Sequence, residues 1–217
     1  MKKVLITLGV TALCSFTLFA QTGERYVVRT AEKPQIRVPA TEAPAALIKI
    51  YSNLGKKTDV YNCCGGFVIW GPTVGGGGSE QFLAMPFTPK SNSTVKQVQA
   101  AIQYSSGDNQ INLSLYNDVN GAPGTLLAGP VTVTNLPGAW TCCTLAVANF
   151  SSGVAVTAGK QYWVTADTPA FGTGSDFVGG WNFIYKTLFF GGNQGSGWYS
   201  AYGDEEEPAG AVYGTVP

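Results

Sequence analysis

The sequence contains no histidine, and only 12% of its 217 residues are charged. Histidine is the commonest general base and the commonest metal ligand, so its absence excludes a Ser-His-Asp triad and the usual zinc sites. Thirteen Lys and Arg balance thirteen Asp and Glu, which leaves no basic surplus for binding nucleic acid. We therefore expect neither a nucleic-acid partner nor a histidine-dependent enzyme.

Long hydrophobic runs are also missing beyond the N-terminus, as is any stretch with helical periodicity. At the N-terminus, Lys2 and Lys3 precede an apolar run that ends at the small residue Ala20. This arrangement is typical of a secretory signal peptide, which we assign to residues 1–20. The sequence thus predicts a secreted protein, extracellular or periplasmic, with no membrane span.

Cysteine is scarce, and if Cys14 leaves with the signal peptide, the four that remain are Cys63, Cys64, Cys142 and Cys143. An even number in an exported chain indicates disulfides. Neighbouring side chains on a strand point to opposite faces, so a bridge within one adjacent pair is strained. We predict bridges between the two pairs, on neighbouring antiparallel strands, each closing a loop of roughly 80 residues and contributing about 4 kcal/mol. A four-cysteine zinc site is the alternative, although zinc ligands usually come as C-x2-C.

The remaining sequence divides into two parts. Residues 21–45 are charged and proline-dotted and have no period, which predicts a flexible leader or an edge extension. Residues 46–217 show short segments of alternating apolar and polar side chains, each bounded by Gly, Asn, Pro or Ser. About ten such segments without a helix predict an all-β domain, a two-sheet antiparallel sandwich resembling a jelly roll.

A series of motifs runs in a characteristic order from about residue 48 to the C-terminus: IYSNLG, CCGGFVIWGP, AMPFTP, LYNDVNGAPGTLL, AGKQYWV and AVYGTV. In this order the chain resembles the bacterial secreted domain called choice-of-anchor R. The resemblance implies a cell-surface or extracellular module with no established activity, often followed by a sorting anchor. The sequence ends at Val216-Pro217 without an LPxTG or Pro-Glu-Pro signal, so we expect secretion rather than surface attachment.

The LYNDVNGAPG motif is a candidate calcium site. Asp118 and Asn120 offer hard oxygen ligands of the kind calcium prefers, and the acidic run at 204–207 could add more. However, Asn, Asp, Gly and Pro are also the residues that a tight turn between strands needs. A full calcium loop would carry several acids at alternating positions. We therefore expect no cofactor, with calcium as the weaker alternative.

The aromatic C-terminal region is a candidate ligand platform. Trp198, Tyr199 and Tyr202 lie in NQGSGWYSAYGDEEE, a loop-like context in which exposed rings could stack on sugars. By contrast, the rings that alternate along one predicted strand are expected in the core: Trp181, Phe183 and Tyr185.

Hydrolysis by paired carboxylates needs two acids about 5 to 9 Å apart. No predicted strand carries acids at the spacing that would place them together, and the one acidic run is expected on a loop before Pro208. We therefore predict no enzyme. The predicted function is a non-catalytic extracellular or cell-surface module with a structural or interaction role. The alternative is a carbohydrate-binding module, and the candidate partners are an extracellular polysaccharide or a surface protein.

Overall fold

The computed structural model describes residues 27–29, 47–56, 60–74, 80–141 and 144–217. The predicted signal peptide, most of the leader, and Cys142 and Cys143 lie outside these ranges. The described residues form thirteen strands and no α-helix. Within them, no helix is long and apolar enough to cross a membrane.

The larger sheet has nine strands in the order β1–β3–β11–β4–β10–β7–β8, and β6 and β12 also pair with β11. Its strands are β1 (Val27–Arg29), β3 (Asn62–Trp70), β4 (Phe82–Phe87), β6 (Ile102–Ser106), β7 (Gln110–Val119), β8 (Ala122–Thr134), β10 (Tyr162–Asp167), β11 (Val178–Asn193) and β12 (Trp198–Pro208).

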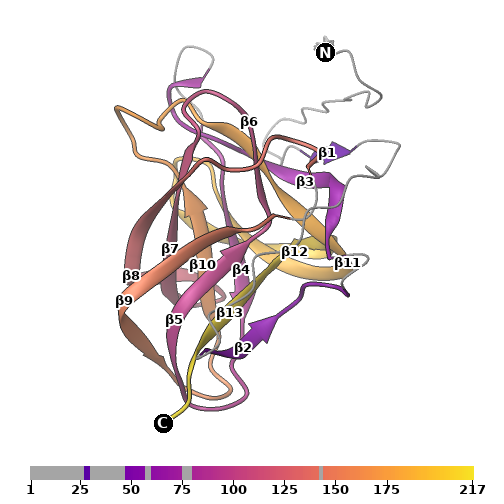
Figure 1. The fold of residues 1–217 in the computed structure, drawn as a ribbon. Helices are drawn as coiled ribbons and strands as arrows, with labels where there is room; N and C mark the ends of the chain where they lie inside the picture. The colour runs from indigo at the N-terminus through magenta and orange to yellow at the C-terminus, as the bar shows by residue number, and fades with distance from the viewer. Residues whose placement is uncertain (1–26, 30–46, 57–59, 75–79, 142–143) are drawn as a thin grey trace.

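The smaller sheet has four strands in the order β2–β13–β5–β9. They are β2 (Ile48–Ser52), β5 (Ser93–Ala100), β9 (Ala146–Val156) and β13 (Gly210–Thr215). Every strand pairing in both sheets is antiparallel. Figure 1 shows the smaller sheet as a layer in front of β4, β7 and β10. The predicted all-β antiparallel sandwich is confirmed.

The core lies between the sheets. The side chains that fill it alternate along each strand and are almost completely buried, among them Leu83, Met85, Leu113, Leu115, Val164 and Ala166 from the larger sheet and Val98, Ala148 and Val212 from the smaller. An aromatic cluster extends the core towards β3 and β11, where the ring of Phe67 lies 4.0 Å from that of Phe190 and 4.6 Å from that of Phe183. Full burial of each such side chain contributes about 1.5–3 kcal/mol. Trp181 and Phe183 are buried as predicted, whereas the side chain of Tyr185 is not described.

Residues 95–104 alternate between apolar and polar side chains and predict a single strand, but they form two strands in different sheets. β5 ends at Ala100 in the smaller sheet, and β6 starts at Ile102 in the larger sheet. Between them, the N–H of Ala101 donates to the carbonyl of Ala209 at 3.0 Å, and its carbonyl accepts from the N–H of Asn182 at 2.8 Å. The alternation continues unbroken through Ala101, so the pattern does not reveal where the chain changes sheet.

The segment around the second cysteine pair also differs from its prediction as a strand. Trp140 has a left-handed φ of 70°, and the N–H of Thr141 bonds back to the carbonyl of Gly138 at 3.2 Å. This local turn stops a strand from forming at residues 140–141. β9 starts only at Ala146 and continues to Val156.

Two terminal regions join the larger sheet. In the predicted leader, β1 pairs antiparallel with β3, so this part of the leader is an edge extension. The predicted loop around Trp198 is β12, paired along β11. The acidic run therefore lies on a strand rather than a loop, and Glu207 is only 1% exposed and accepts a hydrogen bond from Tyr51 at 3.2 Å.

Candidate functional site

Strands β7 and β10 carry a second set of side chains on the face of the larger sheet that points away from the core. The register pairs Asn112 with Asp167, Ser114 with Thr165 and Tyr116 with Trp163. The residues between them on both strands enter the core, so these six alternate to the opposite face. We call this the outer face.

A second carboxylate lies near the end of β10. Ala84 of β4 pairs with Thr165, so β4 begins beside Asp167, and Glu80 comes two residues before β4. The charge of Glu80 acts on Asp167 electrostatically. A Cβ placed at Gly195, in the turn between β11 and β12, would lie 3.9 Å from Oε1 of Glu80. That turn therefore passes next to the acidic pair.

Trp198 is the first residue of β12, just beyond this turn, and pairs with Asn193 of β11. Its ring lies 6.2 Å from that of Tyr116 at an interplanar angle of 58°. Both side chains are partly exposed. Trp198 and Tyr116 therefore form a partly exposed aromatic border next to the carboxylates of the outer face.

The electrostatics of the outer face disfavour the charged form of Asp167 and raise its pKa. Burial, reinforced by the negative charge of Glu80, raises the pKa of Asp167 to about 6, although a hydrogen bond with Asn112 acts in the opposite direction. Burial and the charge of Asp167 also raise the pKa of Tyr116. A buried carboxylate beside a second negative charge is electrostatically unfavourable, so this patch would be stabilised by positive charge.

Thr165 contributes an unsatisfied polar group. It lies between Trp163 and Asp167 on β10 and is completely buried, and its Oγ1 has no hydrogen-bond partner among the described residues. A buried hydroxyl without a partner costs about 1–3 kcal/mol. The floor of the outer face thus retains one unused hydrogen-bonding group.

The three predicted platform residues do not form one surface among the described side chains. Trp198 and Tyr199 are adjacent on a strand and therefore point to opposite faces. The ring of Tyr199 covers Gly192 on β11, where a Cβ would come within 2.7 Å of it. Tyr202 lies in β12, but its side chain is not described. Of the three, only Trp198 lies near Asp167, Glu80, Asn112 and Tyr116. None of these four residues was selected as part of a ligand platform from the sequence.

The two calcium candidates are part of the β7–β8 hairpin. Asn120 and Gly121 have left-handed φ values of 56° and 80°, as a type I′ turn requires. Oδ2 of Asp118 accepts the N–H of Gly121 at 3.2 Å, and Oδ1 accepts from Gln161 at 2.7 Å and Trp163 at 2.8 Å. In the described part of the chain, no three His, Cys, Asp or Glu side chains are grouped as a metal site would need.

Cys63 and Cys64 are buried on β3, with 6% and 3% of their surfaces exposed. The described strands that pair with β3 are β1 and β11. The expected strand pairing between the two cysteine pairs is not tested, because Cys142 and Cys143 lie outside the described residues. However, the hydroxyl of Tyr61 donates to the carbonyl of Thr144 at 3.0 Å, which places the residue next to Cys143 beside the start of β3. Since Cys142 and Cys143 are not described, the disulfides stay a prediction.

The fold and the outer face together define the chain as an all-β sandwich with a mixed aromatic and acidic patch on its larger sheet. No family model, curated protein or solved structure matches it. The resemblance to choice-of-anchor R domains therefore stays a prediction from the sequence motifs.

Proposed function

We propose that this protein is a non-catalytic extracellular module that binds carbohydrate on the outer face of its larger sheet. The observation that carries the proposal is the partly exposed pair of Trp198 and Tyr116 next to Asp167, Glu80 and Asn112. Aromatic faces stack on sugar rings, and carboxylate and amide groups bond to sugar hydroxyls. This combination supports a glycan ligand better than an apolar one.

The extracellular location is part of the proposal. It is supported by the signal-like sequence of residues 1–20, the low charge of the chain and the resemblance to secreted choice-of-anchor R domains. An extracellular polysaccharide is the proposed partner, and a surface glycoprotein would present the same chemistry.

One observation favours a second candidate, glycoside hydrolysis. Two carboxylates share the outer face, and the pKa of Asp167 is raised to about 6, within the range of a general acid. Such an acid beside a second carboxylate is the arrangement that glycosidases use. Release of reducing ends from a bound glycan, abolished by Asp167→Asn, would establish hydrolysis and overturn the non-catalytic proposal.

A glycan array with the secreted chain, followed by calorimetry on the bound glycans, tests the proposal. Trp198→Ala should weaken binding about tenfold or more, because stacking on the ring is lost. Ile48→Ala is the control, since Ile48 is 43% exposed on the smaller sheet and should leave binding unchanged. Equal affinities for Trp198→Ala and the parent chain, or no glycan bound at all, would contradict the proposal.

A further inference from the structure

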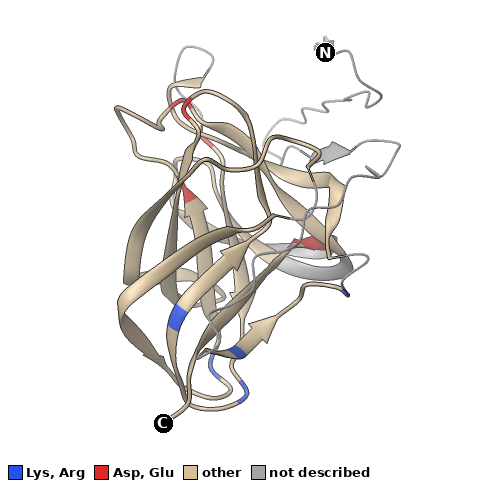
Figure 2. Ribbon diagram, in the orientation of Figure 1, with Lys and Arg blue, Asp and Glu red and all other residues tan. Residues whose placement is uncertain are grey.

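Four charged residues that flank β4 and β10 are separated by sign along these two strands. Glu80 precedes β4 and Asp167 ends β10, whereas Lys90 follows β4 and Lys160 precedes β10. Because β4 and β10 are antiparallel, the two acids lie at one end of the strand pair and the two lysines at the other. Figure 2 shows this separation, with red at the tip of β10 and the blue segments in the lower half.

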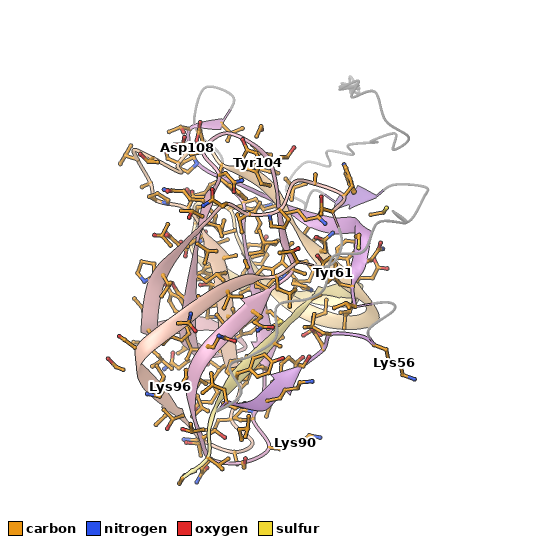
Figure 3. The ribbon with its side chains drawn as sticks, in the orientation of Figure 1. Lys56, Tyr61, Lys90, Lys96, Tyr104 and Asp108 are labelled. Atoms are coloured by element: carbon orange, nitrogen blue, oxygen red, sulfur yellow. The ribbon has the colours of Figure 1, made fainter. Side chains whose placement is uncertain are left out.

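The other described lysine side chains do not face the acidic pair either. Lys49 and Lys96 belong to the smaller sheet, and Lys56 follows β2. Figure 3 shows Lys56, Lys90 and Lys96 in the lower half of the molecule, far from Asp108 at the upper end. Among the described side chains, therefore, no lysine lies on the outer face to balance Asp167 and Glu80.

The aromatic border has the same preference for positive charge. The face of a Trp or Tyr ring attracts an ammonium group within about 6 Å of its centre. Trp198 and Tyr116 border the two carboxylates, so one bound group could contact a ring and a carboxylate together. A neutral sugar would use the rings but leave the charge of the acids uncompensated.

We infer that the ligand is an amino sugar with a free, protonated amine, an inference that rests on the proposed carbohydrate binding. The ring of the sugar stacks on Trp198, and its ammonium group pairs with the carboxylates of Asp167 and Glu80. The unpartnered hydroxyl of Thr165 lies buried beneath the same face, two residues from Asp167. An N-acetylated sugar has the same ring but no charge for the acidic pair.

Calorimetry with two hexasaccharides tests this inference, one of β-1,4-linked glucosamine and one of β-1,4-linked N-acetylglucosamine. The glucosamine hexamer should bind about tenfold or more tightly, since a charge-assisted hydrogen bond is worth about 1.5–3 kcal/mol. Asp167→Asn combined with Glu80→Gln should remove this preference, so that the variant binds the two hexamers with equal affinity. Lys96→Gln, on the smaller sheet, is the control and should change neither affinity.

Spermine is the probe for charge alone. Spermine binding as tight as that of the glucosamine hexamer would overturn the inference, because the sugar ring would then contribute nothing. Equal affinity for the two hexamers would also overturn the amino-sugar inference, as would Trp198-dependent binding of neutral glycans only. Either result would leave the proposed carbohydrate binding in place. Failure of every glycan to bind would instead refute the proposed function itself.

Discussion

The indole N–H of Trp163 donates a hydrogen bond of 2.8 Å to Oδ1 of Asp118, and the amide of Gln161 donates to the same oxygen at 2.7 Å. Trp163 is completely buried, so this bond provides its indole N–H with an acceptor away from water. Asp118 therefore connects the β7–β8 turn to β10, beneath the aromatic border of the outer face.

Replacing Asp118 should destabilise the fold. Asp118→Ala removes the acceptor of a buried N–H together with two other hydrogen bonds, which should lower the free energy of unfolding by about 2–4 kcal/mol. Urea denaturation measures this change. Asn120→Gly is the matched control in the same turn, because glycine adopts the left-handed φ of this position without strain. An Asp118→Ala effect as small as that of the control would contradict the role assigned to this carboxylate.

Calcium should not change the stability of the protein. The oxygens of Asp118 already accept three hydrogen bonds from the chain, and binding of a cation would require breaking them. Thermal unfolding in millimolar calcium and in EDTA should therefore give the same midpoint. An increase of the midpoint with calcium concentration would show that a calcium site exists.

Asp167→Asn should stabilise the protein at neutral pH. The pKa of Asp167 is about 6 in the folded chain and about 3.9 in an unfolded one, so the folded state binds more protons between these values. Stability contributed by this group should therefore fall as the pH rises from about 4 to 6, by about 1–3 kcal/mol.

Urea denaturation over this pH range measures the effect. Asp167→Asn should exceed the parent chain in stability above about pH 6.5 and match it near pH 3.5. The charged or titratable groups facing Asp167 are Glu80 and Tyr116, with Asp118 further along β7. Glu80→Gln should shift the midpoint of the pH dependence to a lower value, because it removes the neighbouring negative charge. The same stability difference at every pH would contradict the raised pKa.

Reduction should lower the thermal midpoint if the two cysteine pairs are cross-linked. Each bridge would close a loop of roughly 80 residues and contribute about 4 kcal/mol. Peptide mapping without reduction should find the peptide of Cys63 and Cys64 joined to that of Cys142 and Cys143. Free thiols, or pairs closed on themselves, would contradict this prediction, although the contact between Tyr61 and Thr144 would remain.

The sheets were predictable from the sequence because alternation of apolar and polar residues reports directly on burial. The larger sheet follows this rule along β7 and β10, where Leu113, Leu115 and Val164 enter the core. The change of sheet at Ala101 was not predictable, since the same alternation continues across it. Strand β12 was not predicted because its segment, WYSAYGDEEEP, does not alternate apolar and polar residues, although long pairing with β11 holds it in the sheet.

The candidate site was only partly predictable. Trp198 was selected with Tyr199 and Tyr202 because its segment resembles an exposed loop, but its partners come from strands distant in the sequence. Asp167 and Glu80 are 87 positions apart, and only the antiparallel pairing of β4 and β10 brings them to the same end. The alternation of Trp163, Thr165 and Asp167 in YWVTAD was the available signal, since it marks a polar and aromatic strand face opposite the one that carries Val164 and Ala166.

The indole N–H resonances of the five tryptophans provide the most direct test of carbohydrate binding on the outer face. The glucosamine and N-acetylglucosamine hexamers would each be titrated into the labelled chain, with Trp198→Phe used for assignment. The account predicts that Trp198 shifts most and Trp163 less, while Trp181 stays unchanged because its N–H is bonded to the carbonyl of Ala209 inside the core. Largest shifts at Trp70 or Trp140, or no shift with either hexamer, would contradict it.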